Sequence, residues 1–295
     1  MKIIVTGGSG FVGAGLVAGL GAAGSGHALL APTHAELELL DAAAVRAYLE
    51  AQRPDAVVHC AVRPGHRHAA DPSAQLEHNT RMFFNLARCA GLYSRVVFVS
   101  SGAVYAAGHY APNMDESYFD HFVPVDEHGF SKYICAKYAE GRPDIVELRA
   151  FGVFGPGEDY AIRFISNAIC KTLFDLPITI KQNRRLDYLY VDDLTPVVDY
   201  FLREGPRHGA YNVCSGRAPE LLELAELVLS VAGKQLPIVV AQPGMGEEYS
   251  GSNARLRAEY RDLRLTPLET AVRALYAWYA QRKKSLNREL LLTDK

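Results

Sequence analysis

The sequence predicts an α/β fold: a doubly wound parallel sheet followed by a smaller C-terminal part. Three observations predict it. Short apolar runs rich in β-branched residues alternate with helical patterns through the first half, and repeated strand–helix–strand units of this kind require parallel strands with helices on both faces. A glycine-rich turn follows the first run, and a Gly/Pro stretch at 152–157 precedes shorter elements. The chain of 295 residues also exceeds the ~150 of an average domain.

The elements of the first half follow from local pattern. Continuous apolar runs predict buried strands, and apolar residues at helical spacing predict helices. Asp41 stands directly before an alanine-rich stretch and is predicted to cap that helix, because a short acidic side chain accepts hydrogen bonds from the free N–H groups of a first turn. In chain order, the sequence predicts strand 3–6, helix 11–23, strand 28–31, helix 42–52, strand 55–60, helix 73–92, strand 95–100, helix 131–140 and strand 145–148.

The second half is predicted to hold shorter elements. The stretch 152–157 is the best internal boundary, because glycine and proline interrupt regular structure. The last residues, 284–295, are expected to fray, as chain ends commonly do. Between them the pattern predicts helix 162–174, strand 178–180 and helices 193–203, 220–231 and 267–282.

Composition excludes several classes of protein. Lysine and arginine number 31 and aspartate and glutamate 33, so the net charge of -2 offers no footprint for nucleic acid or an anionic membrane. No apolar run approaches the ~20 residues of a membrane span. The five cysteines lie far apart without a CxxC pair. We therefore expect reduced thiols in a cytoplasmic protein, and neither a structural metal site nor a disulfide scaffold.

The turn after the first strand reads GGSGFVG over residues 7–13. With no Cβ, Gly7 makes the tight turn, Gly10 leaves room for a pyrophosphate, and Gly13 lets the following helix pack closely on the strand. The N-terminus of that helix, at Phe11 and Val12, presents free N–H groups and the positive end of the helix dipole. Strand, spacing and helix agree, so the sequence predicts a dinucleotide-binding loop.

This glycine spacing and three later motifs resemble the extended short-chain dehydrogenase/reductase family of nucleotide-sugar epimerases, dehydratases and reductases. The later motifs are RVVFVSSGAVY at 95–105, LDYLYVDD at 186–193 and YNVCSG at 211–216. The resemblance therefore covers nearly the whole chain.

The resemblance implies a domain organisation and an assembly. A Rossmann dinucleotide-binding domain is expected over 1–150, with segments near 186–213 returning to it. A mainly substrate-binding region is expected over 151–295. Members of this family pair through the two helices that correspond to those predicted at 73–92 and 131–140, which implies a homodimer.

The resemblance also implies where a nicotinamide cofactor binds. It places Asp41 on the adenine amino group, and Ala61, Asn79 and Lys132 beside the cofactor. An NAD-selective site usually carries an acid at the end of the second strand, and the residues directly after this strand contain none. His34 stands where related reductases carry arginine, and an imidazole can accept a 2′-phosphate. This favours NADP over NAD; the alternative is a loop that contacts nothing.

The catalytic pattern matches the family at two positions and departs from it at a third. In the family, a tyrosine moves the proton of the substrate hydroxyl, a lysine four residues later lowers its pKa, and a serine or threonine hydrogen-bonds the same oxygen. Ser101 and Lys132 match the serine and the lysine. His128 stands where the tyrosine is expected.

Three hypotheses explain His128. Histidine can itself serve as general acid and base, because its intrinsic pKa of ~6.5 is near working pH, and a neighbouring ammonium favours the neutral, proton-accepting form. Alternatively, the protein binds the cofactor without turnover, or residue 128 has been substituted deliberately. We favour the first hypothesis.

Substrate contacts are implied at Ser101 and Arg185. Arg185 directly precedes the motif at 186–193, where the family places an arginine on the nucleotide diphosphate. A planar guanidinium suits a pair of phosphate oxygens. Gly152 replaces the asparagine of the family, so that contact is not transferred. A polar loop with Arg63, His66, Arg67 and His68 is expected near the nicotinamide. A solvated loop is the default interpretation, and an arginine that faces the substrate is the alternative.

Ser101 is followed by Gly102 and Ala103, whereas 4,6-dehydratases of the family carry acids there. Since water elimination needs those acids, a 4-ketoreductase or a 4-epimerase acting on a nucleotide-linked sugar is favoured. The alternative from another class is a catalytically impaired dinucleotide-binding regulatory protein, because a fold does not fix a function. The sequence does not identify the nucleotide or the sugar.

Overall fold

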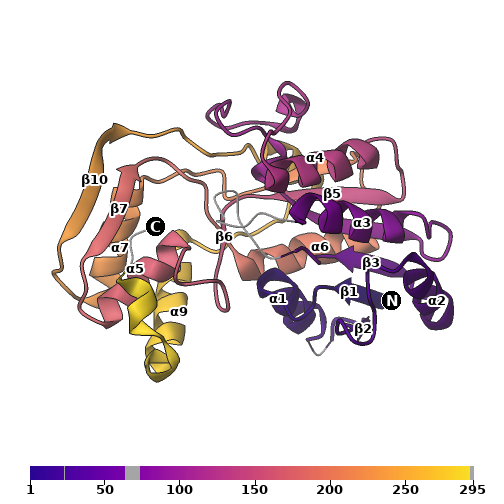
Figure 1. Ribbon diagram of the computed structural model, residues 1–295, viewed down its shortest axis with the longest axis horizontal. Helices are drawn as coiled ribbons and strands as arrows, with labels where there is room; N and C mark the ends of the chain where they lie inside the picture. Colours follow the sequence, from indigo (N-terminus) through magenta and orange to yellow (C-terminus); the bar gives the residue numbers. More distant parts are fainter. Residues whose placement is uncertain (23, 64–73, 293–295) are drawn as a thin grey trace.

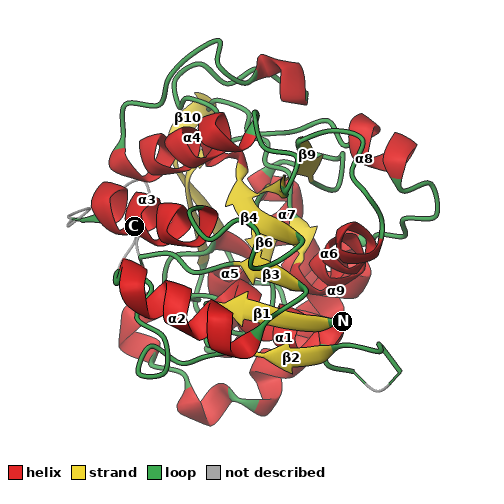
Figure 2. Cartoon of the chain, turned by 90° about the vertical axis from the view of Figure 1, so that its right-hand side faces the viewer, coloured by secondary structure: helices red, strands yellow, loops and turns green. Residues whose placement is uncertain are grey.

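The computed structural model describes residues 1–22, 24–63 and 74–292. Its centre is a six-stranded parallel sheet with the order β2-β1-β3-β4-β5-β9 (Figure 2). The predicted α/β fold with a doubly wound parallel sheet is confirmed. The strands are β1 (Lys2–Thr6), β2 (Ala28–Leu30), β3 (Ala56–His59), β4 (Arg95–Ser101), β5 (Ile145–Ala150) and β9 (Ala210–Val213).

The strand order reverses at β1. β2 pairs with one edge of β1, and β3 pairs with the other. In a doubly wound sheet, ligands bind beyond the carboxyl ends of the strands at the point where the order reverses. The glycine-rich turn directly after β1 occupies this point.

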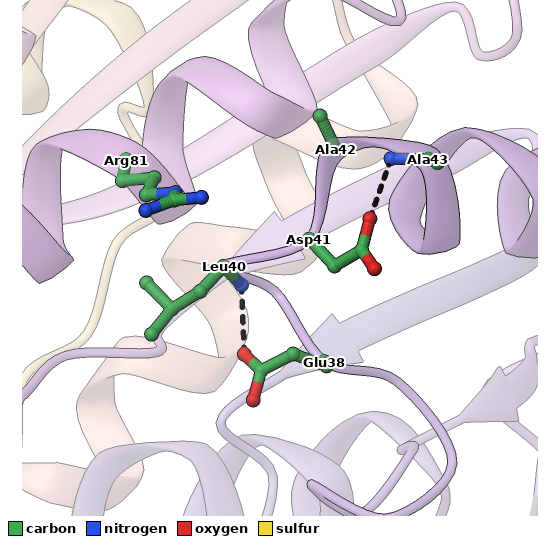
Figure 3. Close-up of a pocket in the computed structure, with 6 residues that line it drawn as sticks. All are labelled: Glu38, Leu40, Asp41, Ala42, Ala43 and Arg81. Carbon is green, nitrogen blue, oxygen red and sulfur yellow. Dashed lines mark hydrogen bonds between the residues drawn. The ribbon is translucent and has the colours of Figure 1, made fainter.

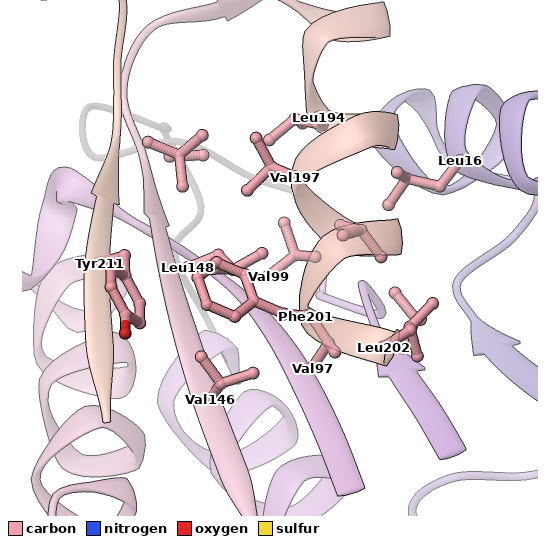
Figure 4. Packing of buried hydrophobic residues seen from close by; sticks show 14 of the residues in the cluster. Leu16, Val97, Val99, Val146, Leu148, Leu194, Val197, Phe201, Leu202 and Tyr211 are labelled. Carbon is pink, nitrogen blue, oxygen red and sulfur yellow. The ribbon is translucent and has the colours of Figure 1, made fainter. Parts of the chain in front are cut away.

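Helices cover both faces of the sheet (Figures 1 and 2). Leu16 and Phe201 pack on Val97 and Leu148 of one face (Figure 4). On the other face, the apolar side chains of three helices bury Phe98 and its neighbours. The first face carries α1 (Phe11–Leu20) and α6 (Leu194–Arg203), and the second carries α2 (Ala42–Gln52), α3 (Gln75–Ala87) and α4 (Glu127–Ala139).

The second half of the chain builds a smaller body beside the sheet (Figure 1). A parallel pair of strands packs with three helices around an apolar cluster that includes Ile169, Val228 and Leu275. A second short parallel pair leads from the sheet to this body. The elements are β6 (Val153–Phe154), α5 (Phe164–Leu173), β7 (Ile178–Asn183), β8 (Leu189–Tyr190), α7 (Leu221–Ala232), β10 (Ile238–Met245) and α9 (Leu268–Gln281). The short helix α8 (Ala254–Glu259) packs instead against β9 of the central sheet.

Several boundaries differ from the prediction. α4 begins at Glu127 rather than 131, because the carboxylate of Asp126 accepts a hydrogen bond from the N–H of Gly129 at 2.8 Å. α3 is shorter than 73–92, and residue 73 lies outside the described residues. The tail prediction is wrong for the described part of 284–295: a 3-10 turn forms at Arg288–Leu291, and Leu291 is buried in the cluster of the smaller body.

None of the helices in residues 1–22, 24–63 and 74–292 has the length and apolar character that crossing a bilayer requires.

Candidate active site

The glycine turn is tightly packed against the neighbouring strand. Gly7 has φ +72°, and a Cβ there would lie 2.7 Å from backbone atoms of Ala61. A Cβ on Gly13 would lie 2.1 Å from the carbonyl oxygen of Gly7, whereas one on Gly10 would meet only that oxygen, at 3.3 Å. No side chain caps the first turn of α1, so its N–H groups at Phe11 and beyond remain available to an anion. The residues present therefore fit a dinucleotide pyrophosphate.

The predicted adenine side lies at the start of α2 (Figure 3). The carboxylate of Asp41 accepts hydrogen bonds from the N–H groups of Ala43 at 2.8 Å and Ala44 at 3.1 Å, both through Oδ1, which confirms the predicted helix cap. Glu38 lines the same surface hollow of about 600 Å³ and accepts from the N–H of Leu40 at 2.7 Å. Sequence reasoning missed Glu38. The sequence signal that could have identified Glu38 is an acidic residue three positions before the helix cap Asp41.

The turn after β2 carries two carboxylates in addition to the predicted histidine. The side chain of His34 is 83% exposed, and its Nε2 lies 3.0 Å from Oε2 of Glu38. The carboxylate of Glu36 accepts hydrogen bonds from the N–H of Thr33 at 2.7 Å and from its hydroxyl at 2.9 Å. These two bonds lower the pKa of Glu36. Glu36 and Glu38 lie just after residues 31–35, the segment in which the sequence shows no acid.

α4 carries the departure from the family pattern. His128 lies in the first turn of the helix and is half-buried, and its carbonyl oxygen accepts a hydrogen bond from the hydroxyl of Ser131 at 2.9 Å. Lys132 follows one turn later, which puts both side chains on one face of the helix. Lys132 is buried, with Nζ 5.4 Å from the ring centroid of Phe98, and burial lowers its pKa.

Ser101 ends β4 at the carboxyl edge of the sheet. Its hydroxyl oxygen accepts a hydrogen bond from the N–H of Ala103 at 3.1 Å and so caps the 3-10 turn η1 (Gly102–Val104). α4 packs against η1. The structure thus brings the serine turn and the helix of His128 and Lys132 together, although they are more than 25 residues apart in the chain.

Asn79 joins the end of β3 to α4. Its side-chain oxygen accepts from the N–H of Arg63 at 2.7 Å, and its Nδ2 donates to the hydroxyl of Ser131 at 3.3 Å. Asn79 is buried. It therefore fixes the strand end of Ala61 relative to the helix that carries Lys132.

A tyrosine from the second half of the chain reaches the serine turn, which sequence reasoning missed. The hydroxyl oxygen of Tyr249 lies 2.3 Å from the position that a Cβ on Gly102 would take. The Tyr249 ring packs on Tyr110 and Phe151, each with centroids 4.9 Å apart. Its backbone is held between Arg185 and Asp187, through bonds of 2.9 Å to each. No spacing in the sequence links Tyr249 to Ser101, so only the fold reveals it.

Arg185 lies beside this tyrosine but already has an acidic partner. Its Nη2 is 3.2 Å from Oε1 of Glu220, and the side chain is 54% exposed. Hydrogen bonds from Asn183 and Arg185 lower the pKa of Glu220. Of the loop candidates for the substrate side, Arg63 lies at the end of the described segment, and His66, Arg67 and His68 lie outside the described residues.

Among residues 1–22, 24–63 and 74–292, no three or more His, Cys, Asp or Glu side chains form a group that could hold a metal ion.

Comparison with known proteins gives consistent results. The model of the NAD dependent epimerase/dehydratase family matches residues 3–214. GDP-6-deoxy-D-mannose reductase of Pseudomonas aeruginosa is 30% identical over 278 residues, covering 86% of this chain and 89% of that protein. ADP-L-glycero-D-manno-heptose-6-epimerase of Cupriavidus pinatubonensis is 28% identical over 264 residues, covering 78% of each chain. The solved structure of RMD from Pseudomonas aeruginosa complexed with NADPH has a TM-score of 0.80 at 28% identity, covering 95% of this chain and 99% of that one.

Proposed function

The chain belongs to the NAD-dependent epimerase/dehydratase family, and from this premise we propose that it is a 4-ketoreductase or a 4-epimerase of a nucleotide-linked sugar. One observation carries the proposal. The glycine turn, the serine turn after β4 and the helix of Lys132 converge at the carboxyl edge of one parallel sheet, where doubly wound folds bind their ligands. The names of the relatives, a reductase and a 6-epimerase of nucleotide-linked sugars, support the substrate class and the reaction type, and the choice of the 4-position is our inference.

The chain's residues divide the work as follows. A bound nicotinamide cofactor supplies or accepts the hydride. The turn of Gly7 and Gly10 and the free N–H groups of α1 hold the pyrophosphate. Ser101 hydrogen-bonds the reacting oxygen, and His128 moves its proton in place of the family tyrosine. Lys132 places a positive charge one helical turn from His128.

The space around Gly102 argues against a dehydratase. A Cβ there would lie 2.3 Å from the Tyr249 hydroxyl and 2.8 Å from the ring of Phe151. An acidic side chain at position 102 does not fit without moving both aromatic residues. Since the eliminating members of the family need acids at this turn, reduction or epimerisation is the better match.

We infer NADP as the preferred cofactor, with NAD as the alternative. A carboxylate in the turn after β2 accepts hydrogen bonds from ribose hydroxyls and repels a 2′-phosphate. Both carboxylates of this turn already accept hydrogen bonds, Glu36 from Thr33 and Glu38 from the N–H of Leu40, which leaves them fewer lone pairs for ribose hydroxyls. His34 stays exposed and can meet a phosphate. The NADPH in the Pseudomonas structure supports this choice.

The test is to follow nicotinamide absorbance while the protein is mixed with NADPH or NADH and a panel of nucleotide-linked 4-keto sugars. We expect oxidation of NADPH with at least one of them, and loss of that rate in Lys132→Met. Glu269→Gln, a change to an exposed carboxylate on α9, is the matched control. Cofactor binding by calorimetry without any turnover, by contrast, identifies the protein as a dinucleotide-binding regulator.

A further inference from the structure

A hydroxyl group from the second half of the chain lies against the serine turn. The phenol oxygen of Tyr249 is 2.3 Å from the position that a Cβ on Gly102 would take. Since a carbon–carbon single bond is about 1.5 Å long, this oxygen lies within about 4 Å of the Cα of Gly102. Gly102 directly follows Ser101. A second hydroxyl group is therefore next to the turn whose serine the proposed function places on the reacting oxygen.

Two glycines make room for this approach. A Cβ on Gly102 would also lie 2.8 Å from the ring of Phe151, and a Cβ on Gly251 would lie 2.7 Å from the same ring. Phe151 is fully buried, and its ring packs on that of Tyr249 with centroids 4.9 Å apart. Because positions 102 and 251 carry no side chain, Phe151 can hold the Tyr249 ring beside the serine turn.

Backbone hydrogen bonds hold the chain on both sides of Tyr249. Toward the smaller body, its N–H donates to the carbonyl oxygen of Arg185 and its carbonyl oxygen accepts from the N–H of Asp187, both at 2.9 Å. Toward the segment that follows the serine turn, the carbonyl oxygen of Ser250 accepts from the N–H of Met114 at 3.1 Å. The phenol therefore has its place before any substrate binds, which is what a preorganised hydrogen-bond donor requires.

The ring contacts of Tyr249 do not require its hydroxyl group. The rings of Tyr110 and Phe151 both pack on it with centroids 4.9 Å apart, and a phenylalanine would make the same contacts. The side chain is half-buried. What tyrosine adds to this packing is an O–H group, which can donate a hydrogen bond at the serine turn.

We propose that Tyr249 is a further catalytic residue, whose hydroxyl donates a hydrogen bond to the keto oxygen of the substrate together with Ser101. The inference rests on the proposed function. During reduction the carbonyl carbon accepts the hydride, the electron pair of the C=O π bond moves to the oxygen, and this oxygen then takes the proton that His128 carries. Tyr249 keeps its own proton and stabilises the negative charge that builds up on the oxygen before the transferred proton arrives.

The first experiment measures the single-turnover rate of NADPH oxidation with the 4-keto sugar of the panel that reacts fastest. We expect Tyr249→Phe to lower this rate by about 100-fold or more, the usual effect of losing one donor to an oxyanion, and to leave the Kd for NADPH unchanged. Tyr200→Phe is the matched control, because it removes the hydroxyl of another half-buried tyrosine, on α6, whose partner is the carbonyl oxygen of Glu259 at 3.2 Å. This variant should react at the wild-type rate.

The second experiment replaces Tyr249 by 3-fluorotyrosine or 3,5-difluorotyrosine through site-specific incorporation. Fluorine leaves the shape of the ring nearly unchanged and makes its O–H a stronger donor, so the single-turnover rate at pH 6 should rise with each fluorine atom. A ring that only packs would give the same rate in both proteins. The ¹⁹F signal of residue 249 should also shift when the 4-keto sugar is added to the protein with NADP⁺, a mixture in which no reduction can occur.

A wild-type rate in folded Tyr249→Phe, or a ¹⁹F signal that does not respond to the bound sugar, overturns the inference and leaves the proposed function standing. If Tyr249→Phe fails to fold, the fluorotyrosine proteins decide, and a rate that does not depend on fluorination overturns the inference. If the wild-type chain reduces no nucleotide sugar at all, the proposed function itself fails, and the inference fails with it.

Discussion

At the residue scale, the central question is whether His128 can move the substrate proton in place of the family tyrosine. If histidine carries the proton, activity follows a group that titrates well below the ~10 of a tyrosine, and carbonyl reduction is fastest at mildly acidic pH, where an imidazolium can donate. His128→Phe should then cost about 100-fold in kcat. His128→Tyr should retain or raise activity, because Ser101 and Lys132 would complete the usual set. The measurement is a pH–rate profile of all three proteins.

The control for this prediction is His121→Phe, which removes an exposed histidine from the segment before α4. A wild-type rate without ionisation between pH 5 and 8, unchanged by His128→Phe, would show that His128 carries no proton. A wild type that binds cofactor and substrate without hydride exchange, and that His128→Tyr activates, would show that histidine disables the site.

A second residue-scale prediction concerns Gly10. Gly10 has φ −80°, which valine also adopts, and a Cβ there meets only the Gly7 carbonyl oxygen. Gly10→Val should therefore leave the fold intact and abolish dinucleotide binding, because the side chain occupies the approach of the pyrophosphate. Calorimetric titration with NADPH checks this, with circular dichroism to confirm folding. The matched control is Gly205→Val, where a Cβ meets nothing within 4 Å; undiminished affinity in Gly10→Val would refute the argument.

At the element scale, local signals predicted the interiors of elements better than their ends. The cap at Asp41 was readable because an acid precedes an alanine-rich stretch. The cap at Asp126 was not, because the irregular polar segment before it hides the start of α4, and His128 was therefore not recognised as a first-turn residue. β10 was missed although it begins with the apolar run IVVA over 238–241; the proline and glycine that follow at 243 and 244 are typical of a turn rather than of a strand.

At the same scale, the turn between β6 and α5 is predicted to make the stability of the fold depend on pH. The carboxyl of Glu158 is buried and accepts hydrogen bonds from the hydroxyl of Ser166 and the backbone of Gly155, and burial raises its pKa to about 7. The folded protein therefore holds a proton between the unfolded pKa of ~4.3 and about 7, where the unfolded chain has lost it. Stability from this group is complete below ~4.3 and falls as pH rises through that window.

Glu158→Gln removes this dependence, because an amide cannot ionise. We expect the free energy of unfolding of the variant relative to wild type to rise by on the order of 3 kcal/mol between pH 4.5 and pH 8. Urea unfolding at the two pH values measures it. For Glu269→Gln, at an exposed side chain of α9, the difference in the free energy of unfolding from wild type should be the same at both pH values. An equally flat difference for Glu158→Gln would mean that the carboxyl is ionised at no cost in the fold.

At the scale of the whole molecule, the sequence predicted those features best whose residues all lie in one continuous segment. The glycine turn, its strand and its helix are continuous in the chain, so the dinucleotide loop could be predicted in full. The contact of Tyr249 with the serine turn joins segments almost 150 residues apart and depends on how residues 246–253 cross between them.

The outer face of α3 and α4 has the character of an interface between two copies of the chain. A groove of about 540 Å³ runs along these helices. It has an apolar floor of Leu76, Phe84 and Ile134 and a charged rim that includes Arg81. Phe84 packs edge-on against Tyr138, which is 36% exposed. An apolar centre with a polar rim is typical of interfaces, and a two-fold axis would pair the groove with itself.

We therefore predict a homodimer built through this groove. Light scattering should give twice the 32.3 kDa chain mass. Ile134→Glu should give the monomer mass at micromolar concentration, because two buried carboxylates would face each other across the axis without partners. The matched control is Val125→Glu, at a side chain that is 99% exposed and lies outside the groove, which should remain dimeric. A wild-type mass of one chain at every concentration would exclude the dimer, and dissociation by both variants would place the interface elsewhere.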